Sequence, residues 1–289
     1  MSKLILGTVQ FGLNYGVNNI AGKPEKSKVF EILKFALSNG IKLLDTAESY
    51  GNAPKIIGLF HRIHRNKFEV ISKYNPKDRS LPDNLLYRVK QNLKEMHIDY
   101  LYAYLFHCYD DFNKNFKNFS ILKKLKKDGL IKKIGVSIYT NNELKEVLKY
   151  DFVDLIQLPF NLLDNHYQRS SLLKIAQDKG LEIHTRSVFL QGLFFMNNNT
   201  LPEKLCAFKP YIVEVDNLAK KENQSKAGLS LNYVLQKEYI DKVLLGVDSL
   251  SQLKENLKSV NSPISKKTED KIDRFVFESP ELLNPSNWK

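Results

Sequence analysis

The sequence predicts an α/β protein built as a (β/α)8 barrel, in which a closed parallel sheet of eight strands lies inside a ring of helices. Short β-rich segments alternate with longer helical segments along the whole chain of 289 residues. The Rossmann fingerprint G-x-G-x-x-G does not occur in the sequence, and no linker rich in Pro, Gly or Ser divides it. These observations favour the barrel over a doubly wound open sheet, and they predict a single domain over residues 1–289.

The expected strands are short runs rich in aliphatic, β-branched and aromatic residues. They cover residues 4–8, 42–45, 68–72, 100–106, 133–136, 153–157, 182–186 and 242–245. Helical patterns lie between them. Residues 27–39 form one such helix, and residues 83–96 form another, whose apolar face consists of Leu85, Leu86, Val89 and Leu93. From residue 264 onward we expect one last helix and a short tail that caps the barrel or covers the site.

The chain is basic, with 44 Lys and Arg against 32 Asp and Glu and a net charge of +12. The lysines are spread along most of the sequence. Their densest group, residues 122–127, has a helical spacing that indicates a solvated helix face, so we expect no nucleic-acid partner. The charge fits an anionic small molecule such as a dinucleotide.

The sequence also predicts a cytoplasmic protein without a membrane partner. No stretch approaches the roughly 18 consecutive apolar residues of a membrane helix, and the start of the chain does not read as a signal peptide. Cys108 and Cys206 lie far apart without a CxxC spacing, which fits a reducing compartment. His61 and His64 have the spacing of a metal pair, but two ligands make a weak site, and we expect no metal.

Four polar side chains fall at or just after successive predicted strands, where a barrel carries its catalytic groups. They are Asp45, Tyr50, Lys73 and His107. Reduction of a carbonyl group by hydride requires an acid for the developing alkoxide, and Tyr50 serves if its pKa is lowered. Lys73 is the cation expected to lower that pKa, Asp45 its counter-ion, and His107 the donor that orients the substrate oxygen.

Each of these residues also has a simpler interpretation. Asp45 caps the next helix, Tyr50 is a packed aromatic, Lys73 is one of many lysines, and His107 is a structural histidine. Taken singly, Lys73 and His107 favour the simpler interpretation. The occurrence of all four at successive strand ends favours the catalytic one.

The sequence resembles the aldo-keto reductase family from about residue 4 to residue 256. The segment LGTVQFG at 6–12 is similar to the family's opening glycine motif, and LDTAESYG at 44–51 matches its D-T-A-x-x-Y-G signature. ISK at 71–73 and LFH at 105–107 match its lysine and histidine positions. The match continues in order with GVS at 135–137, Gln157, NLLD at 161–164, and Glu255 with Asn256.

The resemblance implies NADP(H) or NAD(H) bound across the mouth of the barrel. It implies Ser137 and Gln157 near the nicotinamide carboxamide, and a cofactor-lining segment from Arg186 to residue 193. The loop that begins at Gly246, with the helix after it, would hold the adenosine end. The cofactor residues it implies are Gly7, Ser137, Gln157, Arg186, Ser187, Phe189, Gln191, Gly192, Gly246, Val247, Ser249, Gln252, Glu255 and Asn256.

The chain departs from the family pattern at three positions. Ile138 follows Ser137 where many members have Asn, and Arg186 takes the place of an aromatic residue that stacks on the nicotinamide; a guanidinium plane can stack similarly. Gln252 stands where an arginine commonly binds the 2′-phosphate of NADP, and Asp248 nearby has the wrong sign for that phosphate. Gln252 and Asp248 put the family's usual preference for NADPH in question, so the sequence leaves NADP(H) and NAD(H) both open, with NADH as a real alternative.

The predicted function is reduction of an aldehyde or ketone, including a sugar or sugar derivative, to an alcohol. Two alternatives stay open at this point. One is a non-catalytic, cofactor-binding regulatory subunit, since one fold hosts unrelated functions. The other is a redox epimerase that oxidises and then reduces one sugar carbon. By resemblance we expect a monomer or weak homodimer.

Overall fold

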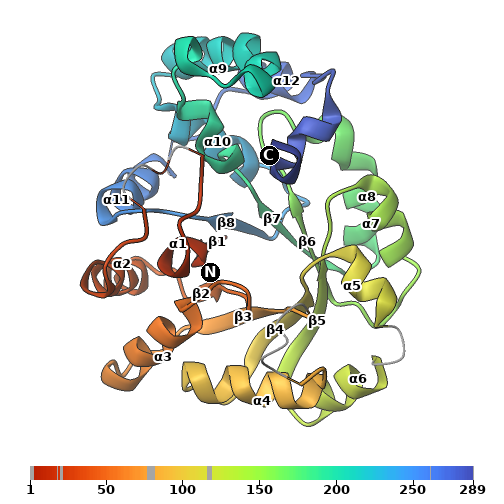
Figure 1. Cartoon of the computed structure of the whole chain (residues 1–289). Helices are drawn as coiled ribbons and strands as arrows, with labels where there is room; N and C mark the ends of the chain where they lie inside the picture. Colours follow the sequence, from red (N-terminus) through yellow and green to blue (C-terminus); the bar gives the residue numbers. More distant parts are fainter. Residues whose placement is uncertain are drawn as a thin grey trace.

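Eight parallel strands close into a barrel in the computed structural model, which describes residues 3–17, 19, 22–76, 82–115, 119–260 and 262–288. The strands follow one another in chain order around the barrel (Figure 1). β1 closes the barrel against β8, with Leu4 opposite Val243 and Leu6 opposite Leu245. The strands are β1 (Leu4–Gly7), β2 (Leu43–Asp45), β3 (Glu69–Tyr74), β4 (Leu101–Phe106), β5 (Ile131–Ser137), β6 (Leu155–Pro159), β7 (Glu182–Arg186) and β8 (Lys242–Leu245). The predicted (β/α)8 barrel is confirmed.

Helices surround the sheet (Figure 1). The longer ones are α2 (Lys26–Ser38), α3 (Ala53–Ile63), α4 (Leu85–Met96), α6 (Phe119–Lys127), α7 (Asn141–Val147), α8 (His166–Asp178), α9 (Lys209–Lys221), α10 (Lys226–Leu235), α11 (Leu250–Ser259) and α12 (Lys266–Asp273). Short helical turns are α1 (Val9–Gly12), α5 (Tyr109–Lys114), η2 (Leu190–Phe195), η3 (Asn198–Thr200), η4 (Glu203–Phe208), η5 (Pro280–Leu283) and η6 (Pro285–Trp288).

Local sequence explains where several of these helices begin. Side chains of Asn84, Ser225, Ser249 and Ser265 accept hydrogen bonds from backbone N–H groups in the first turns of α4, α10, α11 and α12. Thr140 and Glu143 form a capping box at the start of α7. The caps of α4, α7, α10 and α11 fix the starts of these helices close to the carboxyl ends of the strands, where the site lies.

One detail of the predicted apolar face of α4 is wrong. Leu86 is 38% exposed, whereas Arg88 and Asn92 are buried. The face turned inward carries polar side chains because Glu48, a buried carboxylate on a neighbouring loop, binds both of them.

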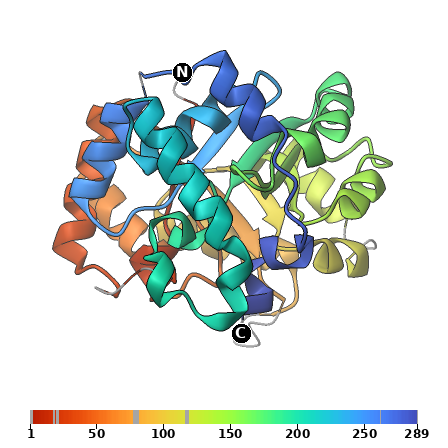
Figure 2. The same ribbon diagram turned by 90° about the horizontal axis from the view of Figure 1, so that it is seen from above.

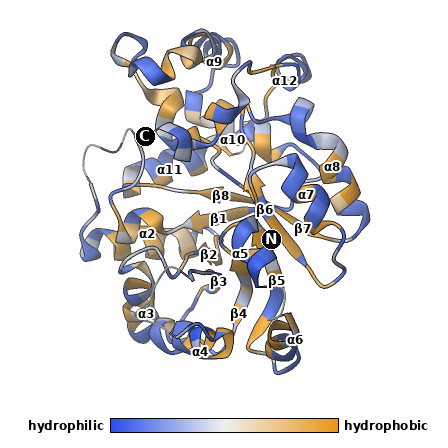
Figure 3. Ribbon diagram, turned by 45° about the vertical axis from the view of Figure 1, so that its right-hand side comes forward, coloured by the Kyte–Doolittle hydropathy of each residue, from blue (hydrophilic) through white to orange (hydrophobic). Residues whose placement is uncertain are grey.

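Apolar residues fill two layers. A small cluster inside the barrel contains Ile5, Leu43, Ile71, Ala103, Leu105 and Leu155. A much larger cluster lies between the outer surface of the strands and the helices. The strands are largely orange, whereas the helices carry both blue and orange residues when coloured by hydropathy (Figure 3), as expected for amphipathic helices packed around a barrel.

A partly buried charged cluster lies toward the amino ends of β4, β5 and β7. The Tyr102 hydroxyl donates to both oxygens of Glu182 at 2.8 Å, and Lys133 pairs with the same carboxylate. His184, fully buried, has Nε2 2.6 Å from Glu182 Oε1. Burial raises the pKa of Glu182, but hydrogen bonds from His184, Lys133 and Tyr102 outweigh it and lower the pKa to about 2.

The last segment of the chain returns to the carboxyl end of the barrel. The start of β1 and the turns η5 and η6 lie at opposite ends of the molecule (Figure 2). The Trp288 indole donates to the Leu282 carbonyl at 2.7 Å, and its ring lies 6.0 Å from that of Phe208. Within the described ranges, no helix has the length and apolarity needed to cross a bilayer.

Candidate active site

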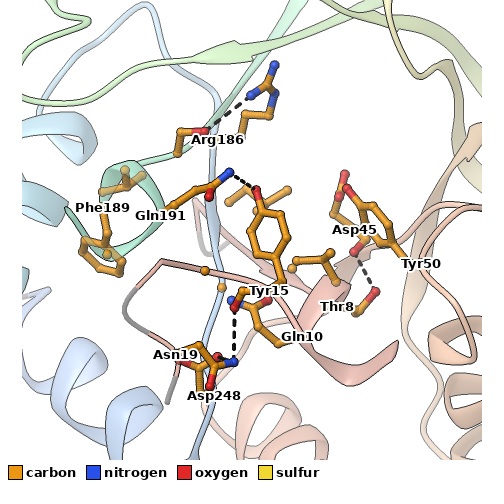
Figure 4. A pocket seen from close by; sticks show the side chains of 18 of the residues that line it. Thr8, Gln10, Tyr15, Asn19, Asp45, Tyr50, Arg186, Phe189, Gln191 and Asp248 are labelled. Carbon is orange, nitrogen blue, oxygen red and sulfur yellow. Dashed lines mark hydrogen bonds between the residues drawn. The ribbon is translucent and has the colours of Figure 1, made fainter. Parts of the chain in front are cut away.

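A cavity of about 500 Å³ opens at the carboxyl ends of the strands, the end at which (β/α)8 barrels carry their sites. Residues of β1, β2, β3, β5, β6, β7 and β8 line it, together with residues of the loops that follow the strands (Figure 4). All four predicted catalytic residues line this cavity: Asp45, Tyr50, Lys73 and His107. The structure thus brings together residues spread over more than sixty positions of the chain.

Asp45 fixes the positions of Lys73 and Gln157 at the inner end of the cavity. One carboxylate oxygen pairs with Lys73 Nζ, and the other accepts a hydrogen bond of 2.8 Å from Gln157 Nε2. Lys73 also donates to the Thr46 carbonyl at 3.1 Å. Both members of the ion pair are 2% exposed, so each charge depends on the other for compensation.

Tyr50 and His107 lie above this pair. The Lys73 ammonium is 5.1 Å from the centre of the Tyr50 ring, and the Tyr50 and His107 rings meet edge to face with centroids 5.7 Å apart. Ser49 Oγ lies 3.3 Å from His107 Nδ1. When this hydroxyl donates, the imidazole carries its own proton on Nε2, where it serves as a donor.

The expected lowering of the Tyr50 pKa by Lys73 is wrong. Burial raises the pKa of Tyr50, Asp45 raises it further, and Arg186 lowers it. The physical reason is that Lys73 is already neutralised by Asp45, while desolvation disfavours a phenolate. Burial likewise lowers the pKa of Lys73, an effect that Asp45 opposes. Tyr50 is therefore held as the neutral phenol, which is the form that can donate a proton.

Two glycines fix the turn that carries Tyr50. A Cβ at Gly12 would lie 1.8 Å from the Tyr50 carbonyl oxygen, so α1 approaches this turn backbone to backbone. Gly51 has a φ of +54°, and a Cβ there would lie 2.6 Å from the Gly12 carbonyl oxygen. Only glycine fits at both positions without displacing Tyr50.

Glu48 fixes the position of the turn that carries Tyr50 through contacts with residues of β4, α4 and the loop after β3. Its carboxylate, 4% exposed, pairs with Arg88 Nη1 at 2.7 Å. It also accepts from the Tyr104 hydroxyl at 2.5 Å, from Asn92 Nδ2 at 3.0 Å and from the Asn75 backbone N–H at 3.0 Å. The acid lies two residues before Tyr50, and this network ties the Tyr50 turn to β4 and α4.

Most of the predicted cofactor residues line the same cavity. They are Gly7, Ser137, Gln157, Arg186, Ser187, Phe189, Gln191, Gly192, Gly246, Gln252, Glu255 and Asn256. Val247 is 1% exposed and does not line the cavity, because it packs in the outer core. Ser249 does not line it either; its hydroxyl caps α11 by accepting from the Gln252 N–H.

The segment after β7 has an unusual backbone. Ser187, Leu190 and Gln191 have φ values of 60°, 46° and 55°, and Gly192 has 90°. Left-handed conformations in side-chain-bearing residues are costly and concentrate at ligand sites. This segment forms one long wall of the cavity, next to the loops after β1 and β8.

Sequence reasoning missed the loop after β1. The Tyr15 hydroxyl accepts from Gln191 Nε2 at 3.0 Å, and the Val17 N–H donates to the Gln191 carbonyl at 3.2 Å. Asn19 Nδ2 donates to Asp248 Oδ1 at 3.1 Å (Figure 4). Thr8, Gln10, Tyr139 and Ser286 also line the cavity without having been predicted. One signal could have revealed this loop: in a (β/α)8 barrel all loops that follow strands meet at the carboxyl end, so the loop after β1 could have been expected to border the site.

The end of the cavity near β8 is negative and polar. Asp248, Gln252, Glu255 and Asn256 form it together with Asn19. The Asp248 N–H donates to Gln252 Oε1 at 2.7 Å, and Glu255 accepts from the Ser251 hydroxyl at 3.1 Å. Among the described lining residues, no Lys or Arg lies at this end.

The two histidines considered as a metal pair have other partners. His61 Nδ1 lies 2.8 Å from the Met96 carbonyl, and His61 Nε2 accepts from the Phe68 N–H at 3.1 Å. His64 Nδ1 lies 2.9 Å from the Phe60 carbonyl. In the part of the chain that the structure describes, no three His, Cys, Asp or Glu residues form a group able to hold a metal.

Comparison with known proteins identifies the family. The Aldo/keto reductase family matches residues 3–276. An NADH-specific methylglyoxal reductase of Escherichia coli (strain K12) is 24% identical over 311 residues, which cover 92% of this chain and 95% of that protein. A holo-form aldo-keto reductase from Bacillus halodurans has a TM-score of 0.75 at 22% identity, covering 96% of this chain and 95% of that one. A glycerol dehydrogenase from Gluconobacter oxydans has a TM-score of 0.76 at 22% identity, covering 99% and 94%.

The chain belongs to the aldo/keto reductase family. It is an oxidoreductase that reduces carbonyl groups with NAD(P)H, as predicted. The regulatory-subunit and epimerase alternatives are not favoured by these relatives.

The residues in the cavity wall fit a dinucleotide. Gln10 Oε1 and Gln157 Oε1 are buried acceptors without a hydrogen-bond partner among the described residues, and both side chains line the cavity. An unpaired buried acceptor is costly, and an amide N–H of a nicotinamide carboxamide is a suitable donor for one of them. The cavity also runs from Tyr50 and Lys73 to the loop after β8, so a long ligand can reach both ends.

Proposed function

We propose that Tyr50 is the general acid of the carbonyl reduction. Asp45 is the counter-ion of Lys73, and His107 is the donor that orients the substrate oxygen, both as expected from the sequence. Lys73 takes a different role, as a cation that stabilises the phenolate left after the proton has been transferred. One observation carries this proposal: the four side chains converge in one cavity, with the Lys73 ammonium 5.1 Å from the Tyr50 ring centre and the His107 ring edge to face with it. A positioned acid contributes about 10²- to 10⁴-fold to such a reaction.

Each residue has a defined task in this proposal. The Tyr50 hydroxyl donates its proton to the substrate oxygen, and His107 donates a hydrogen bond to the same oxygen. When bound, the reduced nicotinamide supplies the hydride that the carbonyl carbon receives. The charges of Lys73 and Arg186 then stabilise the phenolate that Tyr50 becomes, since both cations lie in the same cavity. Asp45 keeps Lys73 charged and in place.

The dinucleotide would be held along the wall from β5 to β8. Ser137 and Gln157 bind the carboxamide, and the segment from Ser187 to Gly192 follows the pyrophosphate. Gly7 and Gly246 allow close approach, and Gln252, Glu255 and Asn256 surround the adenosine. The unpaired Gln157 Oε1 and the strained backbone between Ser187 and Gly192 support this placement. Val247 and Ser249 would act indirectly, by shaping the loop after β8 and capping α11.

We propose further that the enzyme prefers NADH. A 2′-phosphate would meet Asp248 and Glu255 at the adenosine end, where the described lining residues include no cation. Two carboxylates repel a phosphate dianion in a partly desolvated site. The NADH specificity in the name of the Escherichia coli relative supports the same preference.

The substrate class is a small aldehyde or ketone, or a sugar derivative of similar chemistry, in keeping with the methylglyoxal reductase among the relatives. We also propose that the protein works in the cytoplasm as a monomer or weak homodimer. A single domain over residues 1–289 is supported by the barrel, which closes β1 onto β8, and by the return of the tail to the same cavity.

Calorimetric titration with NADH and NADPH, followed by a screen of carbonyl compounds, tests the proposal. We expect binding of both cofactors, tighter for NADH, and loss of reduced-nicotinamide absorbance with a small aldehyde such as methylglyoxal. Equal affinities would contradict the NADH preference. Binding without turnover on any carbonyl would favour a regulatory subunit, and sugar conversion without net cofactor oxidation would favour an epimerase.

A further inference from the structure

Arg186 is the cation of this cavity for which the structure provides no carboxylate partner. The Lys73 charge is paired with Asp45, whereas no carboxylate among the described residues lies within ion-pair distance of the Arg186 guanidinium. Arg186 ends β7 and is half-buried. A charge in a partly desolvated cavity is costly unless an opposite charge compensates it.

The contacts of the guanidinium leave most of its donors available. Nη1 donates to Ser187 Oγ at 3.4 Å (Figure 4). Nη2 donates to the Ile138 carbonyl at 3.3 Å. Both are longer than a usual N–H···O bond of about 2.9 Å. The other N–H groups have no partner among the described residues. One face of the plane covers the Tyr139 ring, with Cζ 4.1 Å from the ring centre.

The position of Arg186 favours the substrate end of the cavity. Its guanidinium lies over Tyr139 and beside the Ile138 carbonyl, on the β5 side, whereas Asp248 and Gly246 belong to the loop after β8. The electrostatic effect of Arg186 also reaches the acid. Burial raises the pKa of Tyr50, and Arg186 is the cation that opposes this rise. Tyr15, Tyr50 and Tyr139 line the cavity together with it.

We propose that Arg186 binds an oxyanion of the substrate, so that the preferred substrates are carbonyl compounds that carry a phosphate or carboxylate group. The planar fork of guanidinium N–H groups matches such an anion in two-point contact. Stacking of the nicotinamide on Arg186 would use a face of the plane, whereas the anion would use its N–H edge, so the two roles are compatible. This inference rests on the proposed carbonyl reduction and names its substrate class.

The test compares two substrates that differ only in the anion, glyceraldehyde and glyceraldehyde 3-phosphate, with NADH as cofactor. We expect the wild-type kcat/KM to favour the phosphorylated substrate by about tenfold or more, the range of a charge-assisted hydrogen bond. Arg186→Gln should remove this preference, and Arg186→Lys should keep part of it. The matched control is Arg274→Gln, which removes an exposed arginine outside the cavity and should leave the ratio unchanged.

Two further measurements distinguish an anion of the substrate from the phosphates of the cofactor as the group that Arg186 binds. Inorganic phosphate should inhibit glyceraldehyde reduction competitively in the wild type and far less in Arg186→Gln. If Arg186→Gln instead weakens NADH binding about tenfold and leaves the substrate ratio unchanged, Arg186 serves the cofactor phosphates and the inference is wrong. If neither substrate is reduced, the proposed function fails. The anion site is then tested separately by calorimetric titration of the wild type and Arg186→Gln with inorganic phosphate. Equal phosphate binding by the two proteins would refute the anion site.

Discussion

Replacement of Arg88 by Met should destabilise the protein strongly, because it leaves a buried charge without its partner. Arg88 is 1% exposed and Glu48 4% exposed, and their ion pair is 2.7 Å long. Arg88 also donates to the carbonyls of Asn75 at 2.9 Å and Pro82 at 3.0 Å. Breaking a buried pair by removing one partner costs about 3–5 kcal/mol. Such a loss is a large part of the roughly 5–15 kcal/mol that stabilises a typical domain.

Urea denaturation followed by circular dichroism measures this loss. The matched control is Lys124→Met, which breaks the pair with Asp128 on the surface; Lys124 is 73% exposed, and the expected cost is less than about 1 kcal/mol. Adding Glu48→Gln to the Arg88→Met variant removes the unpaired charge and should recover part of the stability. A loss below about 1 kcal/mol for Arg88→Met, or no recovery in the double variant, would refute the reasoning.

Three other variants test separate parts of the account. Glu182→Gln should destabilise the protein near neutral pH, and the difference from wild type should vanish as the pH falls from about 4.5 to about 2, because the folded pKa of Glu182 lies below its ordinary value of 4.5. Gly12→Ala should lower kcat by about tenfold or more, because the new Cβ would meet the Tyr50 carbonyl oxygen at 1.8 Å. Gln252→Arg should improve NADPH affinity about tenfold by placing a cation at the adenosine end.

Each of these predictions has a control variant or a result that would contradict it. A Glu182→Gln difference that persists unchanged at pH 2 would mean that Glu182 is not the titrating group. Gly180→Ala adds a methyl group to a glycine with a φ of +77° and no neighbour within 4 Å of the new Cβ, so it strains the backbone without a clash, and kcat should stay normal. Gln177→Arg adds an exposed arginine on α8, and an equal gain in NADPH affinity there would show a non-specific charge effect.

The sequence was sufficient to predict the barrel and the meeting of Asp45, Tyr50, Lys73 and His107 in one cavity, for a physical reason. Strand and helix periodicities are local, and in a parallel barrel the carboxyl ends of all strands meet at one end. Asp45 and Lys73 could therefore be placed together although 28 positions separate them. Gln157 was expected near the nicotinamide carboxamide from the family resemblance alone, and its hydrogen bond to Asp45 became visible only in the structure.

Other features depend on packing that no local pattern contains. Arg88 and Asn92 lie on the inner face of α4 because they bind Glu48, and only the three-dimensional position of that carboxylate reveals it. Tyr15 lines the site because its loop contacts Gln191, 176 positions away. The pKa of Tyr50 is raised by burial and by Asp45, and the extent of that burial cannot be read from the sequence.

The turnover of a Tyr50→Phe variant tests the central claim most directly. The variant keeps the ring that packs against His107 and loses only the hydroxyl. With NADH affinity measured by calorimetry and hydride transfer by single-turnover kinetics, we predict an affinity close to that of wild type and a rate lower by about 10²- to 10⁴-fold. A hydride-transfer rate close to that of the wild type would contradict the assignment of Tyr50 as the acid.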